Sequence, residues 1–255
     1  MLRKGAFTLI ELLVVVAIIA LLISILLPSL KGARDQAKAV KCAANLHQMA
    51  VATHLYLNQN NQCYPGDHAE IAGVGSVITW APALRNLMSG VLDVFWCPAD
   101  ETESKWKPRY NQLQDWTQYG YEPKEVRLNG NNQFFSYGYN GWGVAVFSSP
   151  NLGLGGHVED PNPELAEYVR EQGVKRPAEM IMIADSVSNG NWDSWVSPNK
   201  RNRANWPSNR HFGNCEVLFC DGHVERIPRD KVRAPEDYAM RRWNNDFQSH
   251  RDLWK

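Results

Sequence analysis

The chain divides by polarity close to its start. Residues 7–27 hold 16 Phe, Leu, Ile or Val side chains among 21 positions. As one α-helix this stretch is about 31 Å long at ~1.5 Å per residue, which matches a bilayer hydrocarbon core of ~30 Å. Its one ionisable residue, Glu11, lies near the N-terminal end, where a carboxylate costs less than at the membrane centre. The pattern therefore predicts a transmembrane helix over residues 7–27.

Basic residues lie on one side of this helix. Residues 1–6 contain Arg3 and Lys4, and no Lys or Arg follows until Lys31. The positive-inside rule then places the N-terminus in the cytoplasm and the rest of the chain outside. A secretory signal peptide has a shorter apolar region with a small-residue cleavage site after it. Here the small-residue step precedes the apolar run, so we expect a retained single-pass anchor.

A helical pattern resumes after Pro28 and predicts an amphipathic continuation over residues 28–60. Apolar or small positions recur at spacings of three and four, namely Leu30, Ala33, Ala37, Val40, Ala44, His47 and Val51. Further along, Leu46, Ala50, Leu55 and Leu57 widen the apolar surface, as expected where a helix enters a globular domain. An asparagine-rich stretch before Pro65 marks the expected end of the helix. Residues 7–60 thus predict one rod, half in the membrane and half packed under a domain. Pro28 is where we expect it to kink or locally unwind.

Residues 61–255 predict an exported, β-rich globular domain. Short strands are expected at 77–80, 91–100, 134–143 and 180–186, short helices after Pro82 and over 164–172, and loop insertions over 101–133. Residues 214–227 predict a hairpin with a two-residue type I′ turn at Asp221 and Gly222. The tail, 228–255, predicts a short helix that packs Trp243 and Trp254 on the domain, or else an assembly surface. The fold class is α+β: a long N-terminal helix on an antiparallel sheet with loop insertions.

The amino-acid composition limits which partners and which cross-links are expected for this domain. The chain has 27 basic and 27 acidic residues, and this balance argues against a nucleic-acid partner. All ten Trp lie in the exported part, where they serve either the core or flat platforms for sugar rings. Five cysteines facing an oxidising exterior predict two disulfide bridges and one free thiol, with the pairing open. Cys215 and Cys220 should not pair, because an odd separation puts them on opposite faces of a strand.

Residues 4–15 read Lys-Gly-Ala-Phe-Thr-Leu-Ile-Glu-Leu-Leu-Val-Val. This stretch resembles the N-terminal cleavage and methylation motif of type IV prepilins and type II secretion pseudopilins. The resemblance implies that a prepilin peptidase removes the leader, residues 1–6, at the cytoplasmic side of the bacterial inner membrane and methylates the new first residue. A cut after Ala6 makes Phe7 first and Glu11 fifth, as in the family. A cut after Gly5 keeps the usual glycine before the bond but makes Glu11 sixth, and we favour the cut after Ala6.

The resemblance also implies how subunits assemble. In the family, the carboxylate at the position of Glu11 pairs with the N-terminal ammonium of a neighbouring pilin or pseudopilin subunit and fixes axial register. Thr8 lies within the same motif, and Pro28 stands where pilin helices commonly carry a proline. The alternative for Glu11 is an interfacial carboxylate on a plain membrane anchor.

A second resemblance lies near the C-terminus. His211, nine further residues and then Asp221-Gly222 resemble a signature of a large group of prepilin-like proteins of planctomycete-type bacteria. Residues 95–100, 136–140 and 243–246 resemble recurring pieces of the same group.

Candidate chemistry in this region is a divalent cation site. His211, Asp221 and His223 lie close in sequence, and Asp185 and Asp100 are able to approach from other strands. Zinc or calcium fits such ligands, and the pseudopilin resemblance favours Ca²⁺. The alternative is structural: a hairpin turn at Asp221, and a hydrogen-bonding role for His211.

No motif for a nucleophile, a metalloprotease or a phosphate-binding loop occurs, so no catalytic residue and no enzyme is predicted. The sequence predicts a prepilin- or pseudopilin-like subunit that assembles through its N-terminal helix. The alternative is a tethered extracytoplasmic module that uses the pilin motif for export. Its glycan-binding loops would carry Trp106, Trp116, Trp192, Trp195 and Trp206.

Overall fold

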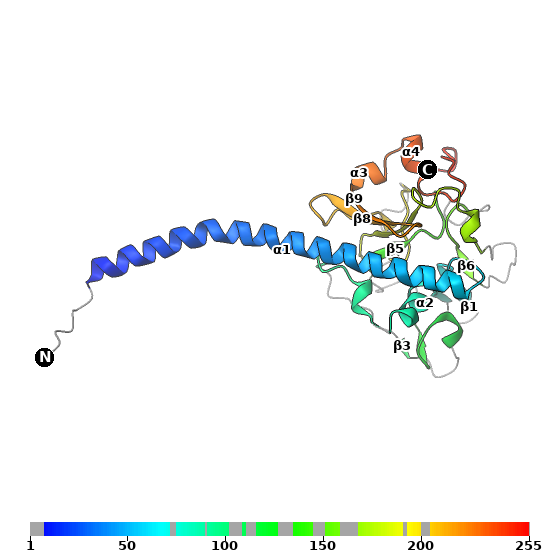
Figure 1. Cartoon of the computed structure of the whole chain (residues 1–255), viewed down its shortest axis with the longest axis horizontal. Helices are drawn as coiled ribbons and strands as arrows, with labels where there is room; N and C mark the ends of the chain where they lie inside the picture. Colours follow the sequence, from blue (N-terminus) through cyan, green and yellow to red (C-terminus); the bar gives the residue numbers. More distant parts are fainter. Residues whose placement is uncertain are drawn as a thin grey trace.

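A single helix, α1 (Leu9–Gln59), runs from the N-terminal end of the chain into a domain that packs around its C-terminal half (Figure 1). Its 51 residues correspond to about 76 Å at ~1.5 Å per residue. The computed structural model describes residues 8–71, 75–89, 91–101, 109–110, 116–126, 135–144, 151–158, 168–190, 193–199 and 205–254. This arrangement confirms the predicted α+β architecture of a long helix on an antiparallel sheet domain.

The first half of α1 stands free of the domain. Every residue from Leu9 to Arg34 is exposed, and within the described residues α1 is the one helix long and apolar enough to cross a membrane. Pro28 lies inside the helix without ending it, although the axis of α1 changes direction along its length in Figure 1. The helix therefore continues from its apolar half into the domain, as expected.

The domain covers a different face of α1 from the predicted stripe, although it does bury Leu46, Ala50 and Leu57 of the four residues expected to widen the apolar surface. The face in the core consists of Ala39, Cys42, Asn45, Leu46, Met49, Ala50, Ala52, Thr53 and Leu57. The predicted stripe, Leu30 to Val51, is exposed instead, with Val40 58% and Val51 52% accessible. Both series follow the three-and-four spacing of a helix, so periodicity alone did not show which face meets the domain. In its C-terminal half, α1 therefore has one apolar face buried against the domain and another apolar face that is exposed.

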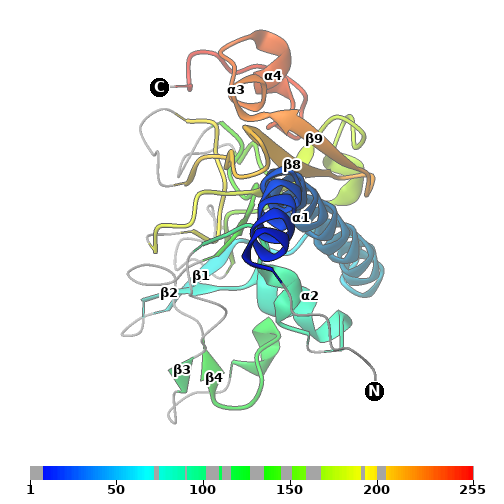
Figure 2. The ribbon, with the colours of Figure 1, turned by 90° about the vertical axis from the view of Figure 1, so that its left-hand side faces the viewer.

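The main sheet has four antiparallel strands in the order β5-β7-β8-β9. These strands are β5 (Tyr137–Tyr139), β7 (Ile181–Asp185), β8 (Asn214–Phe219) and β9 (Val224–Pro228). α1 packs against β8 and β9 on one side and against α2 (Trp80–Leu87) on the other (Figure 2).

Both faces of this sheet are buried. Leu218 and Cys220 belong to the core shared with α1, whereas Cys215 and Val217 belong to a second core with the C-terminal tail. Cys215 and Cys220 thus lie on opposite faces, as predicted. In the second core Trp243 is fully buried, so the tail packs on the domain through this side chain.

β8 and β9 form the hairpin expected over residues 214–227, but its turn is not of type I′. The Gly222 N–H donates to the Phe219 carbonyl at 2.9 Å, and the Phe219 N–H donates to the His223 carbonyl at 3.0 Å. Gly222 has φ +94°, whereas Asp221 has no positive φ, and a type I′ turn requires both. The connection is a three-residue loop that ends in a left-handed glycine.

Several other predicted elements change. Residues 91–100 contain a 3₁₀ turn, η1 (Asp93–Phe95), in place of a strand, because Asp93 and the Cys97-Pro98 step favour turns. The helix expected over 164–172 lies partly outside the described residues, and its described end is the 3₁₀ turn η3 (Glu171–Gly173). In the region predicted as loops, the described pieces include the 3₁₀ turn η2 and strands β3 and β4. The remaining elements are β1 (His68–Ile71), β2 (Gly75–Ile78), β3 (Arg109–Tyr110), η2 (Thr117–Tyr119), β4 (Glu125–Val126), β6 (His157–Val158), α3 (Arg229–Val232) and α4 (Asp237–Arg241).

A glycine in the aromatic strand β5 allows the backbone of a neighbouring segment to approach closely. A Cβ atom at Gly138 would lie 2.7 Å from the backbone of Trp195 and from Val196. Tyr137 and Tyr139 on either side are fully buried. A side chain at position 138 would push the neighbouring segment off the sheet.

Candidate functional site

The N-terminal motif begins the helix. The Oγ1 atom of Thr8 accepts from the Glu11 N–H at 3.3 Å, and the Thr8 N–H donates to Oε2 of Glu11 at 2.8 Å. This reciprocal pair is a capping box, which satisfies two backbone donors that have no partner within the helix. Glu11 is exposed on the helix surface. The processing residues Gly5, Ala6 and Phe7 lie outside the described residues.

The structure separates the three residues that the sequence analysis grouped as metal ligands. His211 precedes β8 and is 1% exposed, whereas Asp221 and His223 flank the turn at the other end of that strand. A six-residue strand spans about 20 Å at ~3.3 Å per residue. His211 therefore cannot share an ion with Asp221 and His223.

Asp221 and Gly222 have structural partners at the hairpin tip. Oδ1 of Asp221 lies 2.5 Å from Nδ1 of His223, and the His223 ring stacks on Phe219 with centroids 4.4 Å apart. A Cβ at Gly222 would lie 3.3 Å from Nε2 of His54 on α1. These contacts fix the turn against the long helix.

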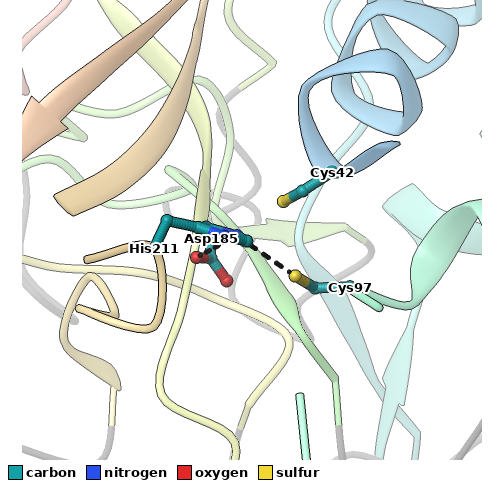
Figure 3. Close-up of side chains that lie close together, drawn as sticks. All are labelled: Cys42, Cys97, Asp185 and His211. Atoms are coloured by element: carbon teal, nitrogen blue, oxygen red, sulfur yellow. Dashed lines mark hydrogen bonds and ion pairs between the residues drawn. The ribbon is translucent and has the colours of Figure 1, made fainter. Parts of the chain in front are cut away.

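His211 instead belongs to a buried cluster with Cys42, Cys97 and Asp185 (Figure 3). One potential ligand atom from each residue lies within 4.8 Å of the other three. Each residue comes from a different part of the fold: α1, the turn after η1, the end of β7, and the segment before β8. The four side chains point toward a common centre in Figure 3. All four are 1% exposed or less.

The ring of His211 faces two groups at once. Its Nε2 atom lies 3.2 Å from Sγ of Cys97 and 3.3 Å from Oδ2 of Asp185. A ring nitrogen carries at most one proton, so it cannot donate a good hydrogen bond to both neighbours. The three atoms are nevertheless held within contact distance.

Further side chains orient the two thiols. The hydroxyl of Tyr137 donates to Sγ of Cys42 at 3.3 Å. Asn45, one turn along α1, approaches the Tyr137 hydroxyl through Nδ2 at 3.3 Å and donates to the Trp96 carbonyl at 3.0 Å. These hydrogen bonds fix the position of helix α1 relative to strand β5 and to the segment before Cys97.

A buried ion-pair network surrounds the carboxylate. Nη1 of Arg210 donates to Oδ1 of Asp185, and Nη2 lies 3.2 Å from Oδ2 of Asp100. The Ser208 hydroxyl donates to Oδ2 of Asp185 at 2.5 Å, and the Ser136 hydroxyl donates to Oδ2 of Asp100 at 2.8 Å. The two carboxylates are thus balanced by one guanidinium and by hydroxyl donors.

Burial and charge set the protonation of the cluster. Burial raises the pKa of the Cys42 thiol well above its usual range. The hydrogen bond with Cys42, helped by His211 and Arg210, lowers the pKa of the Cys97 thiol to about 5 despite its burial. Burial raises the pKa of Asp185 to about 7, although Arg210 and His211 oppose this effect. Of the two thiols, Cys97 is therefore the one that ionises more readily.

The pKa of His211 shows the same competition. Burial, the largest single influence, lowers the pKa of its imidazole. The hydrogen bond with Cys97 and the charge of Asp185 outweigh burial, so the pKa is raised overall. The network as a whole favours a negatively charged sulfur beside the ring.

Asparagines in the stretches 136–140 and 243–246 hydrogen-bond to the backbone of the domain. Asn140 donates through Nδ2 to the carbonyls of Ile181 and Trp243, at 2.7 and 2.9 Å. Asn244 accepts from the Val144 N–H at 3.0 Å. Asn140 thus joins β7 to the C-terminal tail, and Asn244 joins the tail to Val144.

The cysteines differ from the prediction of two bridges. All five lie within the described residues and are free thiols: Cys42, Cys63, Cys97, Cys215 and Cys220. The sequence analysis anticipated that Asp185 and Asp100 approach His211, but it assigned no role to Cys42 or Cys97. Cys97 lies in the stretch 95–100, which the sequence analysis singled out by resemblance, and this is a usable signal. Cys42, between alanines and lysine on a helix, gives none.

The tryptophans proposed for glycan binding do not form an exposed platform among the described residues. Trp116 and Trp195 are 4% and 1% exposed, and the guanidinium of Arg233 lies 3.0 Å from the ring centre of Trp206. Trp106 and Trp192 lie outside the described residues. The described members of the set belong to the packing of the domain.

Comparison with known proteins finds one matching family, at the N-terminus, and similarity to two characterised proteins. Residues 1–27 match the family described as the prokaryotic N-terminal methylation motif. The chain is 37% identical over 86 residues to the type IV wide pilus major component PilA4 of Thermus thermophilus, covering 34% of this chain and 64% of that protein. It is 30% identical over 88 residues to the type II secretion system core protein G of Aeromonas hydrophila, covering 34% of this chain and 61% of that protein.

The matched part of the chain thus spans less than two thirds of either relative. No solved structure matches the chain. The chain therefore carries an N-terminal methylation motif, partial similarity to a type IV pilus component and a type II secretion component, and a helix that is long and apolar enough to cross a membrane.

Proposed function

We propose that this protein is a structural subunit of a type IV pilus-like or type II secretion filament, and that it assembles through α1. One observation carries the proposal: the exposed apolar half of α1 begins with a methylation motif and continues into a domain that leaves a second apolar face uncovered. Such a face has a stabilising contact available only in the membrane or against other helices. The two relatives are themselves named as pilus and secretion components.

The assembly step follows from the position of Glu11. The precursor lies in the inner membrane with its N-terminus in the cytoplasm, and a prepilin peptidase removes residues 1–6 and methylates Phe7. A carboxylate in the membrane is costly unless it is paired. The new N-terminal ammonium of a neighbouring subunit supplies that pair and fixes the register between helices. The C-terminal domain remains outside, and the protein acts as a subunit and not as an enzyme.

The recurring internal stretches support a place in the prepilin-like group that shares the signature from His211 to Gly222. Each stretch has a structural role in this fold. His211 enters the buried cluster, Gly222 forms the turn, and Asn140 and Asn244 hold the backbone. The signature thus joins a buried residue, His211, to the tip of the hairpin, where Asp221 is exposed.

Mass spectrometry of the native protein extracted from membranes tests the processing step. We expect an N-terminal peptide that begins at Phe7, or at Ala6, and carries one added methyl group. A chain that still begins at Met1 would contradict the pilin mechanism and leave an ordinary anchored domain.

Substitution of Glu11 tests assembly separately. Glu11→Ala should leave the protein in the membrane but remove it from filaments recovered by shearing, because the paired charge is lost. Ser24→Ala is the matched control, since the Ser24 hydroxyl donates to the Leu21 carbonyl at 2.7 Å and is satisfied within its own helix. Equal filament incorporation of Glu11→Ala and the control would favour a tether without assembly.

A further inference from the structure

We propose that Cys42, Cys97, Asp185 and His211 form a buried structural site for a divalent transition-metal cation of the zinc class. The proposal concerns the interior of the domain and does not depend on filament assembly. It also differs from the calcium site that the sequence suggested near Asp221.

The distances fit tetrahedral coordination. Zinc lies about 2.3 Å from sulfur and about 2.0–2.1 Å from nitrogen or oxygen, so neighbouring ligand atoms in a tetrahedron lie about 3.3–3.8 Å apart. Nε2 of His211 lies 3.2 Å from Sγ of Cys97 and 3.3 Å from Oδ2 of Asp185. All four ligand atoms lie within 4.8 Å of one another. Small side-chain rotations are sufficient to place all four around one ion.

The ligand types select the metal. Thiolate and imidazole ligands suit zinc and related transition metals, whereas calcium takes six to eight oxygen ligands. Two cysteines, one histidine and one aspartate supply four protein ligands and leave no open position. A closed four-ligand site is typical of structural zinc and not of catalytic zinc.

Formal charge also balances. A divalent cation that replaces two protons, one on the Cys42 thiol and one held between Cys97 and the His211 ring, leaves the total charge of the cluster unchanged. The ion pairs of Arg210 with Asp185 and Asp100 therefore need no rearrangement. A buried site that gains an uncompensated charge would be strongly destabilised.

The surroundings resemble an outer shell of a metal site. Ligands of bound metals are themselves oriented by hydrogen bonds from neighbouring residues. Tyr137 donates to Sγ of Cys42 at 3.3 Å, and Ser208 donates to Oδ2 of Asp185 at 2.5 Å. Bound metal also resolves the position of the His211 ring, whose Nε2 otherwise faces two groups with one proton to share.

The site joins four segments that are far apart in the chain. Cys42 lies on α1, and the other three ligands lie in the turn after η1, at the end of β7 and before β8. A metal bound there would fasten the domain to the helix that carries it. Binding free energy at a structural metal site is folding free energy.

Metal analysis of the full chain in detergent tests the proposal. The native protein should contain about one zinc per chain by elemental mass spectrometry. Protein stripped by a chelator and kept reduced should take up Co²⁺ and show the thiolate-to-metal charge-transfer absorption and strong visible bands of tetrahedral cobalt. Cys97→Ser and His211→Gln should lose the metal. Cys220→Ser is the matched control, because Cys220 is an equally buried thiol outside the cluster.

Several results would overturn the site. They are a reduced protein that binds neither Zn²⁺ nor Co²⁺, a cobalt spectrum without thiolate absorption, or a Cys42–Cys97 disulfide in peptides of the non-reduced native protein. If the ligand variants do not fold, the wild-type cobalt spectrum decides. Tyr137→Phe gives a graded test: loss of its hydrogen bond should weaken zinc binding by roughly 10- to 100-fold, whereas unchanged affinity would argue against Cys42 as a ligand.

Discussion

The Sγ atom of Cys97 lies 3.2 Å from Nε2 of His211, although 114 residues separate them along the chain. The contact joins the stretch 95–100 to the start of the C-terminal signature. Arg210, the residue before His211, also reaches back to Asp100 and Asp185. Stretches that are scattered in the sequence therefore form one buried polar network. Residues in such a network depend on one another, because an unpaired buried charge costs more than the pair contributes.

The thiols give the first prediction. After denaturation with a chelator and without a reductant, all five cysteines should be alkylated, because none is bridged. In the native state Cys63 should react first, since it alone among the five is partly exposed. Counting of modified cysteines by mass spectrometry checks both statements. Two bridges, as composition alone suggested, would leave a single modified site.

Arg210 supplies the second prediction. Arg210→Met should destabilise the domain by about 3–5 kcal/mol, because two buried carboxylates lose their cation. Arg176→Met is the control: Arg176 pairs with Glu179 at 2.8 Å but is 60% exposed, so its loss should cost about 1 kcal/mol or less. Urea unfolding of both variants measures the difference. Equal effects would show that the network does not stabilise the fold.

The sequence predicted those parts that depend on local chemistry. The long run of apolar residues predicted α1, the run from Ile181 to Ala184 predicted β7, and the Asp221-Gly222 pair predicted a hairpin. The type of turn was wrong, because Asp221 keeps an ordinary φ and only Gly222 is left-handed. Local residues thus indicate that the chain reverses, while the twist of the paired strands decides how.

The face of α1 and the buried cluster were not predictable in the same way. Two series with helical spacing run along α1, and the choice between them depends on the shape of a domain formed by residues far along the chain. Cys42 lies on the face of α1 that packs against the domain, and for this reason it belongs to the cluster. His211 was singled out but assigned to Asp221, which is near in sequence, whereas its partner Cys97 lies near in space. Side-chain clusters from four segments require the topology to be known.

The hairpin glycine gives a third prediction. Gly222→Ala should destabilise the domain by about 1–3 kcal/mol, because alanine is strained at a positive φ and its Cβ would lie 3.3 Å from Nε2 of His54. Gly32→Ala is the matched control. Gly32 lies in the exposed part of α1, and a Cβ atom there would have no neighbouring atom within 4 Å, so alanine fits the helix. Thermal unfolding distinguishes them, and equal stability of the two variants would contradict the strained turn.

The exposed apolar face of α1 gives the last prediction. Val40 is 58% exposed and lies opposite the buried face that contains Leu46. If this face packs against other subunits, Val40→Asp should leave the stability of the domain unchanged and prevent filament incorporation. Leu46→Ala should instead act on stability: it should destabilise the domain by about 2–5 kcal/mol, as for other buried leucines. Sheared-filament yields and urea unfolding of the same variants separate the two faces.

Charge itself must be separated from position in this test. Asn58→Asp adds the same negative charge at an exposed polar residue of α1, beyond the apolar stripe, and should assemble as the unchanged protein does. Val40→Ala shortens the side chain without adding charge and should reduce assembly only modestly. Normal incorporation of Val40→Asp would restrict the contacts between subunits to the membrane half of α1. Loss of assembly in that variant, with Asn58→Asp unaffected, would extend them along the helix beside the domain, because desolvating a carboxylate in an apolar contact is strongly unfavourable.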